Sequence, residues 1–154
     1  DAEIDLVIKK CKELGVNVVL STVWAEGGKG GEELAKEVVR LCEEEKGDFT
    51  FAYELDGTIE EKISAVVRRV YGGDGVVLAP AAVAEAKRLT ALGYDKMPVC
   101  MAKTQYSFSD DPKLLGVPTG FEMQVNEVRL SAGAGFIVVI CGKIMTMPGL
   151  PAHV

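Results

Sequence analysis

The chain has 154 residues, 48% of them hydrophobic and 26% charged, a composition that fits one folded domain or a domain with an appendage. Its net charge of -6, without a cluster of Lys and Arg, argues against a nucleic-acid-binding surface. No apolar run approaches the ~18 residues of a membrane span, and no signal-peptide pattern opens the chain, so we expect a cytoplasmic protein with no membrane partner.

The four cysteines lie far apart in the sequence, each among apolar residues, at positions 11, 42, 100 and 141. This spacing favours neither a zinc site nor a disulfide scaffold. Free and mostly buried thiols are typical of a reducing compartment. The chain opens without Met, directly into a helical pattern, and we expect it to have been cut from a longer protein.

Hydrophobic periodicity over the first 54 residues predicts alternating elements. In order these are a helix, a strand buried on both faces, a glycine-rich loop, a second helix and a second strand, at residues 2–14, 16–20, 26–31, 34–41 and 49–54. Gly15 is placed to stop the first helix in a left-handed conformation.

The middle of the chain continues the alternation. Thr58 and Glu61 have the spacing of a capping box, which predicts a helix from there to Tyr71. Pro80 is typical of a first helical turn and predicts another helix, ending near residue 92. Residues 97–102 then read as a third buried strand. Alternation of this kind favours a layered, largely parallel sheet with right-handed crossovers.

The alternation of predicted helices and strands stops after residue 102. Residues 103–120 form a long polar loop, of a length that is usually functional or mobile within a compact domain. Residues 121–126 alternate apolar and polar, and residues 136–141 are continuously apolar. We expect these to be antiparallel strands at the edge of the fold, joined by Ser131–Gly135.

The predicted fold is therefore α/β, with a mostly parallel sheet flanked by helices and an antiparallel strand pair near the C-terminus. We expect residues 1–120 to form an α/β domain with ligand-facing loops. Residues 121–154 would add the strand pair and an irregular tail packed on the same domain.

Three polar or glycine-rich segments follow directly on predicted strands, at residues 21–31, 54–57 and 103–120. Ligands of open parallel sheets gather at the carboxyl ends of strands. Trp24, in the first segment, either offers its ring face to a flat ligand or caps the sheet as a core residue. The glycines after it either cradle an anion or form a turn into the next helix. The sequence pattern favours the turn.

The third segment opens with a cation, two hydroxyls, an amide and a phenol within Lys103–Ser107. Such donors suit a phosphate or the polar edge of a heterocycle, and a self-satisfied surface loop is an equal alternative. Asp110 and Asp111 more often cap a turn than bind a metal. His153, the single histidine, lies in the tail and is a poor general base, so we expect neither a catalytic residue nor a metal site.

Four unusual strings carry a family resemblance, at residues 24–30, 98–107, 128–137 and 145–151. They read Trp-Ala-Glu-Gly-Gly-Lys-Gly, Pro-Val-Cys-Met-Ala-Lys-Thr-Gln-Tyr-Ser, Val-Arg-Leu-Ser-Ala-Gly-Ala-Gly-Phe-Ile and Met-Thr-Met-Pro-Gly-Leu-Pro. The chain resembles, over essentially its whole length, the C-terminal region of formate–tetrahydrofolate ligases and of the larger folate synthases that contain this ligase.

The resemblance implies an ATP-dependent joining of formate to tetrahydrofolate through formyl phosphate, with Mg²⁺ accompanying the ATP. By resemblance, the folate-binding residues are Trp24, Glu26, Gly27 and Gly28. Those near the adenine of ATP are Gln105, Tyr106, Ser107, Pro118, Thr119 and Gly120.

The family's P-loop and anion-binding arginine have no counterpart among these residues. Phosphoryl transfer needs a positioned and neutralised γ-phosphate, so we expect the chain alone to be inactive and its partner to be an N-terminal P-loop portion of the same enzyme. A packing or oligomerisation role, with a possible homo-oligomer, is the alternative. An unrelated α/β module that binds small molecules is a third reading.

Overall fold

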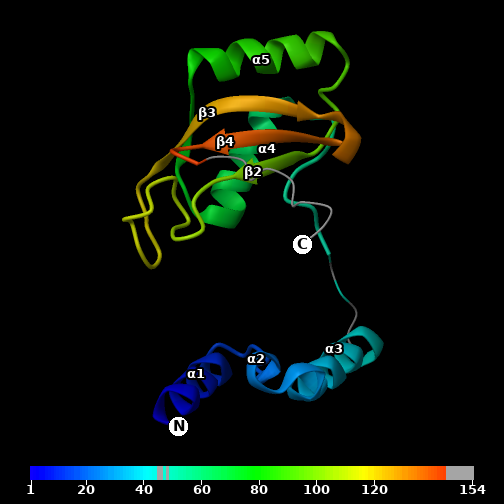
Figure 1. The fold of residues 1–154 in the computed structure, drawn as a ribbon, viewed down its shortest axis with the longest axis vertical. Coiled ribbons are helices and arrows are strands. Elements are labelled where there is room, and N and C mark those ends of the chain that lie inside the picture. The colour runs from blue at the N-terminus through cyan, green and yellow to red at the C-terminus, as the bar shows by residue number, and fades with distance from the viewer. Residues whose placement is uncertain (45–46, 48, 145–154) are drawn as a thin grey trace, which may run out of the picture. The chain divides into compact units, whose positions relative to one another are not determined.

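A computed structural model describes residues 1–44, 47 and 49–144 of the chain. Contacts between Cα atoms divide the chain into two compact units, Asp1–Thr50 and Phe51–Val154. Figure 1 colours the first unit blue to cyan and the second mainly green to orange. The string at residues 145–151 and His153 lie outside the described residues.

The first unit is helical. It contains two longer helices, a single helical turn and a 3₁₀ turn: α1 (Ala2–Glu13), α2 (Val23–Glu26), η1 (Gly27–Gly31) and α3 (Glu32–Glu44). The predicted first helix is confirmed, and Gly15 has the left-handed φ of +70° that stops it. No described residue of this unit is buried, so the apolar residues of α1 and α3 build no core within it.

The strands predicted at residues 16–20 and 49–54 are wrong. A strand exists only when neighbouring strands complete its ladder of hydrogen bonds, and among the described residues none pairs with either segment. Within residues 49–54, Ala52 and Tyr53 instead make hydrogen bonds to other parts of the second unit. The Ala52 carbonyl accepts a hydrogen bond from Arg69, and the Tyr53 hydroxyl accepts one from the Val99 amide at 2.9 Å.

The second unit is built on a four-stranded sheet with the order β1-β3-β4-β2. The strands are β1 (Gly75–Leu78), β2 (Val99–Ala102), β3 (Glu122–Ser131) and β4 (Phe136–Cys141). β1 pairs with β3 in parallel, β2 pairs with β4 in parallel, and β3 and β4 are antiparallel. The predicted fold class, with its C-terminal antiparallel pair, is confirmed.

The predicted division after residue 120 stays a prediction. The strands on either side of that position belong to one sheet, since β1 pairs with β3 and β2 with β4.

Helices flank this sheet (Figure 1). They are α4 (Ile59–Val66), which widens into the π-helical turn η2 (Val67–Tyr71), and α5 (Pro80–Ala91). The predicted capping box is present: Thr58 Oγ1 accepts the Glu61 amide at 3.2 Å, and the Glu61 carboxylate accepts the Thr58 amide at 2.8 Å. Pro80 opens α5 as predicted.

One hydrophobic core joins both helices to the sheet. Its fully buried members include Ile63 and Val67 from α4 and η2, Leu89 from α5, and Met123 and Val139 from the strands. The close packing of this core fixes the positions of the strands. Loops that leave the strand ends therefore begin at fixed points.

The expectation of mostly buried thiols is wrong, because only Cys141 is buried, Cys11 is half-buried, and Cys42 and Cys100 are exposed. Alternation along β2 explains Cys100: Val99 and Met101 face the core, so the residue between them faces away.

Candidate functional site

The glycine-rich segment of the first unit is a closed turn. The Thr22 amide donates to the Gly30 carbonyl at 3.0 Å, and the Glu26 amide donates to the Thr22 carbonyl at 2.9 Å. Gly27 has a φ of +61°, which disfavours any residue with a Cβ. A Cβ on Gly30 would lie 2.5 Å from the Thr22 carbonyl carbon. Two glycines are therefore needed for this turn to close.

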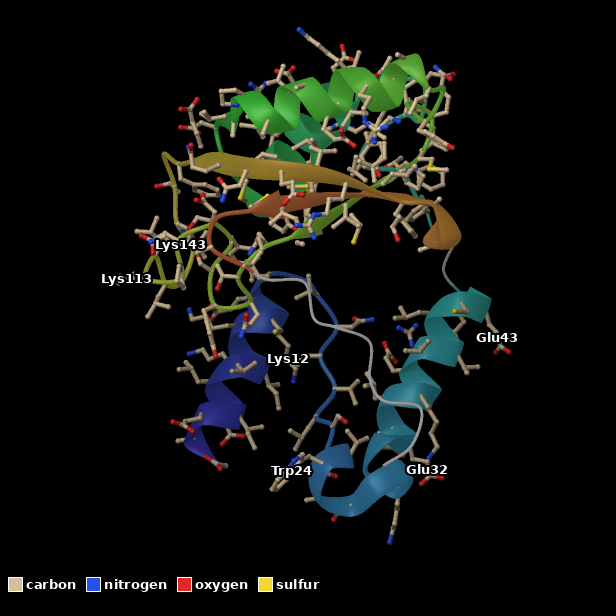
Figure 2. All side chains as sticks on the ribbon, turned by 45° about the horizontal axis from the view of Figure 1, so that its top comes forward. Lys12, Trp24, Glu32, Glu43, Lys113 and Lys143 are labelled. Carbon is tan, nitrogen blue, oxygen red and sulfur yellow. The ribbon has the colours of Figure 1, made fainter. Side chains whose placement is uncertain are left out.

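Trp24 lies on this turn and is 98% exposed. Figure 2 shows its side chain projecting away from the ribbon of α2. Within its own unit Trp24 covers no core, because no described residue of that unit is buried. The alternative in which Trp24 caps the sheet stays a prediction. Glu26, two residues on, accepts a hydrogen bond from the Thr22 hydroxyl at 2.7 Å, so its carboxylate helps to close the turn that presents the ring.

The predicted turn into a helix is confirmed for the glycines, because η1 leads directly into α3. The first turn of α3 carries Glu32 and Glu33. Their carboxylates already compensate the positive end of the helix dipole. An anion held by this helix terminus would meet two negative charges, which disfavours the anion-cradle alternative.

Of the three segments predicted to follow strands, only residues 103–120 follow an observed strand. This long loop leaves β2 at Ala102 and is ordered by buried serines. Ser107 Oγ donates to the Leu114 carbonyl at 2.6 Å and lies 2.9 Å from Ser109 Oγ. Ser109 Oγ in turn accepts the Asp111 amide and donates to the Asp111 carbonyl, both at 3.1 Å.

Lys103, the first residue of the loop, turns its ammonium inward. Its Nζ donates to the Thr104 carbonyl at 2.8 Å and to the Ser107 carbonyl, and it lies 5.1 Å from the centroid of the Tyr71 ring. Burial lowers the pKa of Lys103. This ammonium satisfies the loop, as in the self-satisfied alternative.

A cavity of about 700 Å³ opens between this loop, the middle of β3 at Asn126 and the end of β4. The side chains of Gln105 and Tyr106 line it, as do charged and amide groups from Asp110, Asp111, Lys113, Asn126 and Lys143. Figure 2 shows Lys113 and Lys143 at the same end of the sheet. The structure thus brings two predicted nucleotide-binding residues to one cavity.

The remaining predicted nucleotide-binding residues lie elsewhere. Ser107 is buried, with its hydroxyl engaged inside the loop. Pro118, Thr119 and Gly120 lead into β3 and are not part of the lining described for the cavity. Sequence reasoning missed Lys143, although its position just after a strand is the same signal that identified the Lys103 segment.

Of the two adjacent acids, Asp111 caps the turn as predicted: its carboxylate oxygen accepts the Lys113 amide at 2.9 Å. Within residues 1–44, 47 and 49–144, no group of three or more His, Cys, Asp and Glu is arranged to hold a metal ion. No helix in the described part of the chain is long and apolar enough to cross a membrane.

An α/β sheet with a polar cavity at its strand ends, in a chain that also presents an exposed aromatic ring, belongs to the class of proteins that bind small molecules. The family model for formate–tetrahydrofolate ligase matches residues 1–154, and the chain belongs to this family. The resemblance read from the four strings is confirmed, as is the assignment to a ligase of tetrahydrofolate-dependent one-carbon metabolism.

Proposed function

We propose that this chain supplies the folate-stacking and adenine-side walls of a ligase active site. The reaction joins formate to tetrahydrofolate with ATP and Mg²⁺. Formate attacks the γ-phosphorus and ADP leaves, and the folate amine then attacks the carbonyl carbon of formyl phosphate. Phosphate leaves, and formyltetrahydrofolate is formed. The observation that carries the proposal is the exposed ring of Trp24 on a closed turn.

Trp24 is 98% exposed, so its ring face is free to stack on a flat ligand. The turn beneath Trp24 is closed by backbone hydrogen bonds and by Glu26, so the ring is presented from a defined backbone. In the proposed site the folate ring system stacks on Trp24. Glu26, Gly27 and Gly28 form the adjoining edge, where glycines without side chains allow close approach.

On the nucleotide side, we propose that Gln105 and Tyr106 contact the adenine. They line one cavity, and an amide with a phenol ring suits the edge and face of a heterocycle. Ser107 contributes by holding the loop. Pro118, Thr119 and Gly120 would meet the nucleotide from the approach to β3.

Activation of formate needs a phosphate cradle, and no P-loop motif occurs in these 154 residues. We propose that the P-loop portion of the same enzyme provides it in the cytoplasm, and that this chain alone is inactive. ATP hydrolysis by the purified chain, at a rate above that of a mock purification without the chain, would contradict this.

The folate wall can be tested by calorimetric titration of a reduced folate into the chain and its Trp24 variants. Trp24→Leu removes the ring face and should weaken binding about three- to tenfold, the range expected for loss of one stacking contact. Trp24→Phe keeps a ring face and is the matched control, with a smaller loss. Equal affinities for all three proteins would exclude stacking on Trp24.

A packing or oligomerisation role is the second candidate, because large apolar side chains of the first unit are exposed, among them Leu6, Leu14, Leu20 and Val38. Light scattering would compare the mass of this chain with that of the full-length ligase. A dimer or larger assembly of the isolated chain, with no folate binding, would favour this role over the first.

A further inference from the structure

We propose that Lys103 is a positioning residue: its ammonium fixes the loop from Thr104 to Leu115 and so holds the cavity wall formed by Gln105 and Tyr106 in place before a ligand arrives. The effect on nucleotide binding rests on the function proposed above. The effect on the loop itself does not.

The contacts of the ammonium leave it little capacity for a ligand. A lysine has three N–H donors. Here the Thr104 and Ser107 carbonyls accept from Nζ, while the face of the Tyr71 ring lies 5.1 Å away, within the range of a cation–π contact. Lys103 therefore joins three segments: the end of β2, the start of the loop and the π-helical turn η2.

The loop continues the same network with its own side chains. Ser107 Oγ donates to the Leu114 carbonyl at 2.6 Å, which ties the early part of the loop to its later part. Ser109 accepts the Asp111 amide. On the sheet side, Gly142 lies so close that a Cβ there would be 2.7 Å from the Asp110 carbonyl oxygen. The loop is thus held by Lys103, by two buried serines and by close packing on the end of β4.

Loss of the ammonium would leave two carbonyl oxygens without their donor in a partly buried place. Such groups are costly unless they rearrange toward water, so the loop would sample other conformations. A ligand that needs the native loop then binds with an affinity reduced by the fraction of competent molecules. The chemical step, which Lys103 does not touch, should keep its rate at saturation.

Hydrogen exchange measured by mass spectrometry tests the loop directly. Lys103→Met and, independently, Ser109→Ala should speed exchange of peptides covering residues 104–115 by about tenfold or more, while peptides of α5 stay protected. Lys87→Met, which removes an exposed lysine from α5, is the matched control and should change neither region. Unchanged exchange in the loop would overturn the inference. So would faster exchange throughout α5, which would show that Lys103 holds the whole domain.

Steady-state kinetics of the full-length ligase test the consequence. Lys103→Met should raise KM for ATP about tenfold, the change that 1.4 kcal/mol produces, and leave kcat and KM for tetrahydrofolate within about twofold. A loss confined to kcat would overturn the positioning role and make Lys103 a catalytic residue. Absence of ligase activity in the unsubstituted enzyme would overturn the proposed function and the nucleotide part of this inference. The exchange experiment would still decide the role in the loop.

Discussion

Gly28 and Gly30 occupy the same glycine-rich turn but meet different surroundings. A Cβ on Gly30 would lie 2.5 Å from the Thr22 carbonyl carbon, whereas a Cβ on Gly28 would meet nothing within 4 Å. We predict that Gly30→Ala breaks the hydrogen bond from the Thr22 amide to the Gly30 carbonyl, because the backbones must separate. Exchange of the Thr22 amide, followed by NMR, should become faster.

Gly28→Ala is the matched control for this measurement, and it should leave the exchange of the Thr22 amide nearly unchanged. Equal exchange in the two variants would show that the turn tolerates a side chain at Gly30 and is not closed as described.

The four thiols should differ in reactivity. Burial raises the pKa of Cys141 to about 12, above its ordinary value of 9.0. The neutral thiol is favoured in the folded protein, so the stability that this burial allows is present below pH 9 and is lost as the pH rises toward 12. Since only the thiolate is nucleophilic, Cys141 should resist iodoacetamide at pH 8 in the native protein.

Exposed Cys100 in the neighbouring strand β2 is the internal control. Mass spectrometry after alkylation should find Cys100 modified and Cys141 unmodified until denaturant is added. Equal labelling of both cysteines in the native protein would contradict the burial of Cys141.

At the scale of single residues, the sequence predicted a polar, ligand-suited segment at Lys103, but not that the Lys103 side chain points into the loop. Residue types and the position after a strand identify a ligand-suited loop, and Gln105 and Tyr106 do line a cavity. The inward turn of Lys103 depends on Tyr71, thirty-two positions earlier, and on Ser107, whose carbonyl points back only once the loop has folded. Spacing along the chain carries no signal for such a contact.

Helix α4 owes its start to the capping box. Thr58→Ala should lower the free energy of unfolding by about 1 kcal/mol, the usual value of a threonine cap. Chemical denaturation at pH 7 measures this. Thr90→Ala is the matched control, because the Thr90 hydroxyl bonds only to the Ala86 carbonyl within α5, and its effect should be smaller. A larger loss from Thr90→Ala would contradict the capping role.

The same cap makes a pH dependence. Hydrogen bonds from the Thr58 amide and then its hydroxyl hold the pKa of Glu61 below its ordinary value of 4.5. The stabilisation is therefore complete above pH 4.5 and is lost as the pH falls through the lowered pKa.

Among the elements, those with a clear period or cap signal were predictable and short strands were not. The helices at residues 2–14 and 80–92 and the strand at residues 136–141 follow their patterns closely. β1 has only four residues between a glycine-rich break and Pro80, which is too short for a hydrophobic period to be recognised. Val16–Leu20 shows the opposite error, because an apolar run does not supply the neighbouring strand that it needs.

A bulge adds a further limit on prediction in β3. The register shifts between Val125 and Glu127, so the core-facing positions change from odd to even numbers and the next buried residue is Val128. The alternation visible at residues 121–126 predicts the first half of the strand, and the inserted residue reverses the pattern for the second half.

At the scale of the whole molecule, the described core lies entirely in the second unit. Residues 51–154 produced alone should unfold in one cooperative thermal transition, seen by circular dichroism, since every buried residue described belongs to them. Residues 1–50 alone have no buried residue among those described and should show no cooperative transition. A cooperative transition in residues 1–50, or its absence in residues 51–154, would contradict this division of the core.

The sheet also has an electrostatic consequence. Its two parallel pairs run in opposite directions, so β1 and β3 begin at the end of the sheet where β2 and β4 finish. The strand dipoles oppose each other and supply little net field at that end. The cavity at that end is lined by Lys113 and Lys143 and also by Asp110 and Asp111, so the positive and negative side chains offset each other. Salt screens exposed charges over about 8 Å at 0.15 M, but neither the strands nor this balanced lining supplies a net field to screen, so occupancy of this end of the sheet by an anion should change little with ionic strength.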